Sequence, residues 1–255
     1  MIKSAIITSG LLKPFKKIDG SLINAFEYFY TLYELGIRIQ LQVCNKNFNI
    51  FEFQNFLKLR YNCDFEALQN IVYVDSKPLK MALFVDCESL YTLSSINSLK
   101  YAYLSCDSTS IETIGNNIAI IGNKKVLLIC ESPSTTPEKF KMNYVPSFRL
   151  DLMKPRTQIE NKIFVNCPGK YLKLKANKIQ YQDLQVPNNF DFFNSMIYIQ
   201  NPNCLDRKPR VFQECQYFGI PYKIYKMIFK DGAYYRSFMH YKKMDSNDFV
   251  ISLFL

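Results

Sequence analysis

The chain of 255 residues is long enough for one large domain or two compact ones, each with its own core. Hydrophobic residues make up 48% of the sequence and charged residues 21%, a balance that excludes a disordered tail and a bundle of membrane helices. The formal net charge of +10 is unevenly distributed. Residues 1–140 carry 14 Lys and Arg against 13 Asp and Glu, whereas residues 141–255 carry 18 against 9.

Cysteine and histidine usage narrows the chemistry further. The eight cysteines are at least eleven positions apart, so we expect reduced thiols packed as small hydrophobic residues rather than disulfides or a zinc site. A single histidine, His240, excludes multi-histidine metal centres. The apolar run at residues 4–8 is too short for a signal peptide, and no run reaches the length of a membrane span. The sequence therefore predicts a cytoplasmic protein without a membrane span.

Strand-like and helix-like segments alternate through residues 1–140. The run at residues 4–8 predicts a buried strand that ends in Ser9-Gly10, and apolar residues at helical spacing predict a helix over residues 22–35 that Gly36 closes. The remaining predicted elements of this half are a strand at 37–43, a helix at 51–60, strands at 71–74 and 81–85, and apolar runs at 117–121 and 125–130. Alternation of this kind predicts an α/β fold.

The second half begins after a stretch that lacks periodicity. Residues 131–156 contain four prolines and coincide with the change in charge, so we place a domain boundary there and predict domains at 1–140 and 141–255. Strands are predicted at 162–166, 196–200 and 221–225, with a helix at 209–219. In a fold of two α/β halves, we expect ligands at the carboxyl ends of the strands, in the cleft between the halves.

The segment at residues 199–225, IQNPNCLDRKPRVFQECQYFGIPYKIY, carries the most specific pattern. Pro209 suits the first turn of a helix, and the basic residues Arg207, Lys208 and Arg210 surround its positive end, which favours binding of an anion such as a diphosphate. Arg210 and Glu214 lie four residues apart on one helix face, where a carboxylate could accept ribose hydroxyls. The alternative is an ordinary ion pair on a solvated face.

The stretch DRKPRVFQECQYFGIP resembles the C-terminal nucleotide-sugar signature of GT-B glycosyltransferases, and the likeness elsewhere is only architectural. The resemblance implies two Rossmann-like halves that face each other across a cleft. It also implies a nucleotide-sugar donor, for which we expect UDP-glucose, as a co-substrate, with no permanently bound cofactor and no obligatory metal. The donor-binding residues that it implies are Glu214 for the ribose, Arg207, Lys208, Arg210 and Lys170 for the diphosphate, and Ser9, Gly10 and Gly20 near the sugar.

Glycosyl transfer requires a base that deprotonates the acceptor hydroxyl. Asp86 directly follows the strand predicted at 81–85 and is our first candidate, with Asp19 and Glu131 as rivals. Asp86 could instead cap a helix that begins at Cys87. A competing interpretation takes Asp86 and Glu88 as a degenerate DxD motif, which resembles the metal site of GT-A glycosyltransferases.

The basic second half suggests a polyanionic acceptor. Lys173, Lys175 and Lys178 lie in the run KYLKLKANK, and tyrosines interleave with the lysines of this half, a mixture typical of nucleic-acid binding. The chain looks like a compact relative of the bacteriophage glycosyltransferases that modify hydroxymethylated DNA bases, so we expect DNA as partner and a flipped-out target base. The alternatives are a glycan acceptor at an anionic membrane and a non-catalytic protein that binds nucleotide or nucleic acid.

Overall fold

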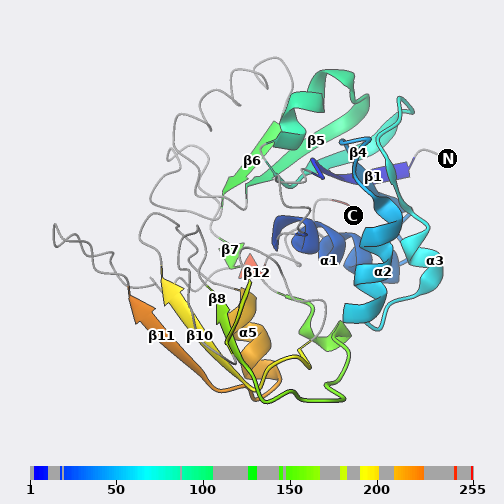
Figure 1. The fold of residues 1–255 in the computed structure, drawn as a ribbon. Helices are drawn as coiled ribbons and strands as arrows, with labels where there is room; N and C mark the ends of the chain where they lie inside the picture. The colour runs from blue at the N-terminus through cyan, green and yellow to red at the C-terminus, as the bar shows by residue number, and fades with distance from the viewer. Residues whose placement is uncertain are drawn as a thin grey trace, which may run out of the picture.

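The computed structural model describes residues 3–10, 18, 20–86, 88–105, 126–130, 144–145, 148–166, 179–182, 190–200, 210–226, 244–245 and 254. Within these residues the chain forms an α/β structure with two larger parallel sheets (Figure 1). The α/β class predicted from the sequence is thereby confirmed. None of the helices in these ranges combines the length and the apolar character that crossing a membrane requires.

The first sheet has six parallel strands in the order β3-β2-β1-β4-β5-β6. Its strands are β1 (Lys3–Thr8), β2 (Ile39–Val43), β3 (Ile71–Tyr73), β4 (Leu79–Phe84), β5 (Ser98–Ser105) and β6 (Val126–Cys130). This is the order of a doubly wound Rossmann-like sheet, in which the winding direction reverses between β1 and β4. The loops that follow β1 and β4 therefore meet at the switch point where such sheets bind ligands.

Helices of the first half pack on this sheet because each carries an apolar stripe. They are α1 (Gly20–Glu34), α2 (Ile50–Arg60) and α3 (Phe65–Leu68), together with the 3-10 helix η1 (Glu88–Ser95). α1 buries Leu22, Phe26, Phe29 and Leu32 against β1 and β2. The predicted helix at 22–35 is thus observed almost as expected, and Gly36 ends it with a positive φ of 73°.

The second sheet has four parallel strands in the order β11-β10-β8-β9. Its strands are β8 (Ile163–Asn166), β9 (Ile179–Gln182), β10 (Ser195–Gln200) and β11 (Tyr222–Lys226), and α5 (Arg210–Tyr217) lies between β10 and β11 in sequence. The remaining described elements are the 3-10 helix η3 (Leu150–Leu152) and a parallel pair of short strands, β7 (Tyr144–Val145) and β12 (Met244–Asp245). Here β9 and β10 flank β8, so the winding direction again reverses beside the first strand.

One hydrophobic core joins the described parts of the two halves. It runs from Phe26 and Phe29 on α1 to Phe164, Met196 and Val211 around the second sheet. A smaller cluster covers the opposite face of the first sheet, beneath η1. In Figure 1, α1 lies between the two sheets, and α5 is on the side of the second sheet that faces α1. The domain boundary predicted at residue 140 lies outside the described residues and stays a prediction.

Candidate functional site

Asp86 lies at the switch point of the first sheet, immediately after β4. Its Oδ2 accepts hydrogen bonds from Thr8 Oγ1 at 2.7 Å and from the Ser9 amide at 2.9 Å. Its Oδ1 accepts from the Ser89 amide at 2.7 Å, and Ser89 Oγ returns a bond to the Asp86 carbonyl oxygen. Asp86 therefore caps η1, the role that the sequence left open as an alternative, and it also ties the end of β1 to the start of η1.

The surroundings of Asp86 bear on its chemistry. The residue is only 9% exposed, and burial raises the pKa of its carboxyl group, which the bonds from Ser9, Thr8 and Ser89 oppose. Because both oxygens already accept hydrogen bonds, a substrate hydroxyl would have to compete with these donors. Its role as a catalytic base stays a prediction.

The predicted donor-loop residues Ser9 and Gly10 lie beside Asp86. Gly10 has a φ of 59°, and a Cβ at this position would lie 2.2 Å from Val43 Cγ1. Its carbonyl oxygen accepts from Asn45 Nδ2 at 3.3 Å. The structure thus brings the ends of β1, β2 and β4 together in a tightly packed corner, whereas Gly20 begins α1.

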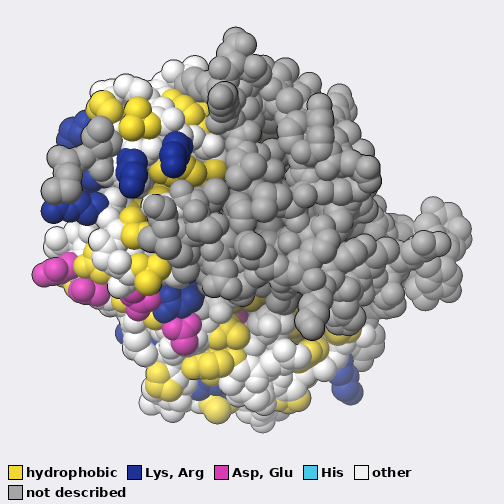
Figure 2. All heavy atoms as spheres, turned by 180° about the vertical axis from the view of Figure 1, so that it is seen from behind, with side chains coloured by type: hydrophobic (Ala, Val, Ile, Leu, Met, Phe, Trp, Pro, Cys, Tyr) yellow, Lys and Arg dark blue, Asp and Glu magenta, His cyan; other side chains and the backbone are white. Residues whose placement is uncertain are grey.

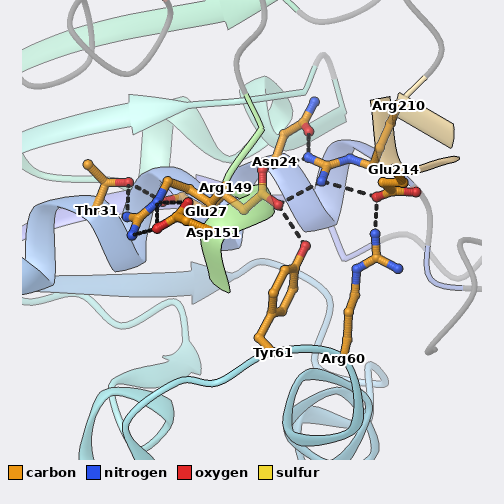
Figure 3. A network of polar contacts seen from close by, with 9 residues as sticks. All are labelled: Asn24, Glu27, Thr31, Arg60, Tyr61, Arg149, Asp151, Arg210 and Glu214. Carbon is orange, nitrogen blue, oxygen red and sulfur yellow. Dashed lines mark hydrogen bonds and ion pairs between the residues drawn. The ribbon is translucent and has the colours of Figure 1, made fainter. Parts of the chain in front are cut away.

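A second set of polar side chains lies buried between the halves, and we call it the buried network (Figure 3). It consists of Asn24, Glu27, Arg60, Tyr61, Arg210 and Glu214. Arg210 Nη1 and Nη2 bind Glu27 Oε1 and Oε2 at 2.6 and 2.7 Å. The Tyr61 hydroxyl also donates to Glu27 Oε1, at 2.6 Å. Two arginines and two glutamates balance each other inside the protein.

Arg210 is therefore directed at α1. Its guanidinium forms a bidentate pair with Glu27, binds Asn24 Oδ1 and lies 4.2 Å from the centre of the Phe148 ring. Burial disfavours the charge of Arg210, but Glu27 offsets that effect, and the pKa of Arg210 lies above its ordinary value. In this arrangement the donors of Arg210 serve the contact between α5 and α1, and its predicted role at a diphosphate stays untested.

Glu214 is held through one of its two oxygens. Oε1 binds Arg60 Nη2 and lies 3.6 Å from Arg210 Nη1. The i,i+4 pair of Arg210 and Glu214 thus exists, but it is buried rather than solvated, because the Glu214 side chain is 1% exposed. Within the described part of the chain, no hydrogen bond or ion pair uses Glu214 Oε2.

Sequence reasoning missed Glu27 and Arg60. Glu27 lies in the buried stripe of α1, and Arg60 ends α2 beside the buried Phe56 and Leu57. A charged residue at a helix position where the spacing demands an apolar one is a signal that could have identified both.

Several predicted residues lie outside the described residues. They are Asp19, Glu131, Lys170, Lys173, Lys175, Lys178, Arg207 and Lys208, together with Cys87. In Figure 2, the Lys and Arg side chains that are described on that face are spread out, with hydrophobic side chains between them. Among the described residues there is no group of three or more His, Cys, Asp and Glu side chains that could hold a metal ion.

The cysteines with a described state are Cys44, Cys63 and Cys215, and all three are free thiols. Burial raises the pKa of Cys215 to about 12, so this thiol stays protonated against Met196 and behaves as a core residue.

No protein-family model matches this sequence, and a search of curated proteins finds no match.

Proposed function

We propose that the chain is a glycosyltransferase that moves a sugar from a nucleoside diphosphate to a hydroxyl acceptor. The observation that carries this proposal is the pair of parallel sheets, each with its winding reversed beside the first strand. In Figure 1, the arrowheads of β6 in the first sheet and of β10 and β11 in the second are on the same side of the molecule. Two ligand-binding strand edges on one side suit a reaction between two substrates.

We assign the donor to the second half. The segment between β10 and α5 carries Arg207 and Lys208 just before the helix, where positive charge would stabilise the departing diphosphate. Glu214, one turn into α5, has an unused carboxylate oxygen that suits a ribose hydroxyl. Because Arg210 is committed to Glu27, the proposed diphosphate contacts fall on Arg207, Lys208 and Lys170.

We assign the acceptor to the first half, with Asp19 as the base. Asp19 directly precedes α1 in the segment that begins at Ser9, and Asp86 holds the start of that segment. We assign the base to Asp19 rather than to Asp86 because hydrogen bonds already occupy both carboxylate oxygens of Asp86. The proposed acceptor is a hydroxymethylated base in DNA, and the basic composition of the second half supports a polyanionic partner.

The experiment is transfer of radiolabelled sugar from nucleotide donors to duplex DNA with and without hydroxymethylated pyrimidines. Incorporation into the modified DNA alone is expected, and it should survive EDTA, since basic side chains neutralise the diphosphate. Loss in EDTA with rescue by manganese would favour the metal site at Asp86 and Glu88. Transfer to glycans only would remove the DNA acceptor, and no turnover with any donor would leave a binding protein.

Asp19→Asn tests the assignment of the base in the same transfer experiment. We expect turnover to fall about a hundredfold or more while donor affinity stays close to wild type. Normal turnover of this variant would move the base to Asp86 or Glu131.

A further inference from the structure

Basic side chains form a row at the amino ends of the strands of the first sheet, and we call it the basic row. The strands β2, β1, β4 and β5 are neighbours in space in this order. The basic row has one residue at the start of each strand, in the same order: Arg38, Lys3, Lys80 and Lys100. Adjacent strands lie about 4.8 Å apart, so the row is about 15 Å long.

The register of the sheet brings these residues to one level. Lys3 pairs with Leu79, the residue before Lys80, and Lys100 pairs with the residue after Lys80. On the other side of β1, the amide of the residue after Lys3 donates to the Arg38 carbonyl oxygen at 3.1 Å. Hydrogen bonds between the strands therefore fix the backbone positions from which the basic side chains extend.

No described carboxylate compensates the charge of the basic row. All of its side chains are exposed, and none forms an ion pair with a described residue. The acidic residues on the adjoining segments have other partners: Asp75 lies 3.7 Å from Lys77 Nζ, and Glu34 binds Arg149. On the left of Figure 2, the side on which the chain begins, Lys and Arg side chains are interspersed with hydrophobic side chains.

Protection of a sheet edge does not explain the basic row. Lysines on edge strands prevent pairing with another chain, but the strands that carry this row each have a neighbour on both sides. The nearly neutral sum of residues 1–140 conceals the row, because carboxylates such as Glu27 and Asp86 are buried elsewhere in this half. A linear group of uncompensated positive charges is typical of a surface that binds a polyanion.

We propose that the basic row binds the phosphate backbone of duplex DNA. A duplex carries one negative charge per about 1.7 Å of its axis, so a row of about 15 Å meets several phosphates at once. A membrane surface would instead engage charges and apolar side chains spread over a broad face. Leu99 precedes Lys100 and is 76% exposed, so an anionic membrane is the competing partner in the test.

The basic row is remote from the proposed acceptor site. Lys80 and Asp86 lie toward opposite ends of β4, about 20 Å apart at the rise of an extended strand. DNA on the row therefore does not deliver its base to the switch point, and the row holds a different stretch of the polymer. The inference goes beyond the proposed reaction and does not rest on it.

The salt dependence of DNA binding tests the inference. Fluorescence anisotropy of a labelled duplex, in KCl from about 50 to 200 mM, gives the slope of log affinity against log salt concentration. Lys80→Gln combined with Lys100→Gln, the row variant, should make this slope shallower by about 2. The matched control is Lys46→Gln combined with Lys162→Gln, which removes the same charge after β2 and before β8 and should leave the slope within about 0.5 of wild type.

Lysine acetylation locates the contact on the protein. A saturating amount of the duplex should protect Lys80 and Lys100 from an N-hydroxysuccinimide acetate, as read by mass spectrometry. Lys46 should be acetylated at the same rate with and without the duplex. This measurement reports on the basic row itself, whatever phosphate contacts the basic second half adds to the slope.

The outcomes separate this inference from the proposed function. An unchanged slope in the row variant, or an equal change in the control variant, would overturn the inference, and so would equal protection of Lys46 and Lys80. If the row variant loses binding to phosphatidylserine vesicles while its DNA slope stays that of wild type, the row belongs to a membrane contact instead. A protein that transfers no sugar would still show the predicted slope and protection, so failure of the proposed function leaves this inference standing.

Discussion

Gly10 shows how single residues shape the switch point of the first sheet. Its left-handed backbone and its closeness to Val43 leave no room for a side chain. Asp86 completes the corner through bonds to Thr8, Ser9 and Ser89. Local geometry, rather than a glycine-rich run, forms this corner.

Gly10→Ala should lower the free energy of unfolding by about 2 to 4 kcal/mol, since a strained backbone adds to overpacking against Val43. Gly36→Ala is its control, because Gly36 also has a positive φ but a Cβ there meets nothing within 4 Å. That variant should lose only about 1 kcal/mol. Equal losses in urea unfolding would show that contact with Val43 contributes nothing.

At the scale of elements, α2 links local sequence to the buried network. Asn49 Oδ1 accepts from the Glu52 amide at 3.0 Å and caps the helix, and Arg60 ends it. The start of α2 thus depends on a solvent-exposed cap, whereas its end depends on contacts from both halves.

Asn49→Ala should cost about 1 kcal/mol of folding free energy, because a first-turn amide loses its acceptor. The exposed neighbour Asn47 provides the control: its side chain caps no helix, and Asn47→Ala should stay within about 0.5 kcal/mol of wild type. Urea unfolding of both variants checks this, and a loss in Asn47→Ala as large as that in Asn49→Ala would contradict the cap.

Elements with strong periodicity were predictable, and those without it were not. The predicted helix at 209–219 is observed as α5, and the predicted strand at 221–225 as β11. β5 was missed, because its sequence SLKYAYLS interrupts the apolar pattern with Ser and Lys although Ala102 and Tyr103 are buried. The predicted apolar run at 117–121 lies outside the described residues.

At the scale of the whole molecule, buried charge joins the two halves. The Arg210 and Glu27 side chains are 9% and 1% exposed and lie 183 positions apart in sequence. Sequence spacing revealed the pair of Arg210 and Glu214 but neither its burial nor its partners on α1 and α2, because those contacts exist only once both sheets have packed. The strand orders were unpredictable for the same reason.

Glu27→Gln should destabilise the protein by about 3 to 5 kcal/mol, because it leaves the buried Arg210 charge without its partner. Arg210→Met should cost a similar amount for the converse reason. The double variant should lose less free energy of unfolding than the sum of the two single losses. We expect the difference to be about 1 kcal/mol or more, because the double variant leaves neither charge unpaired. Strict additivity in urea unfolding would contradict a direct interaction between the halves at this pair.

The most direct test of the proposed function is release of nucleoside diphosphate from UDP-glucose, UDP-galactose, UDP-N-acetylglucosamine and GDP-mannose, measured with and without DNA that contains hydroxymethylated pyrimidines. We predict that at least one donor releases its nucleoside diphosphate and that the modified DNA stimulates this release. Glu214→Gln should slow the release at low donor concentration. No release above the enzyme-free rate, from any of the donors and with either DNA, would contradict the assignment as a glycosyltransferase.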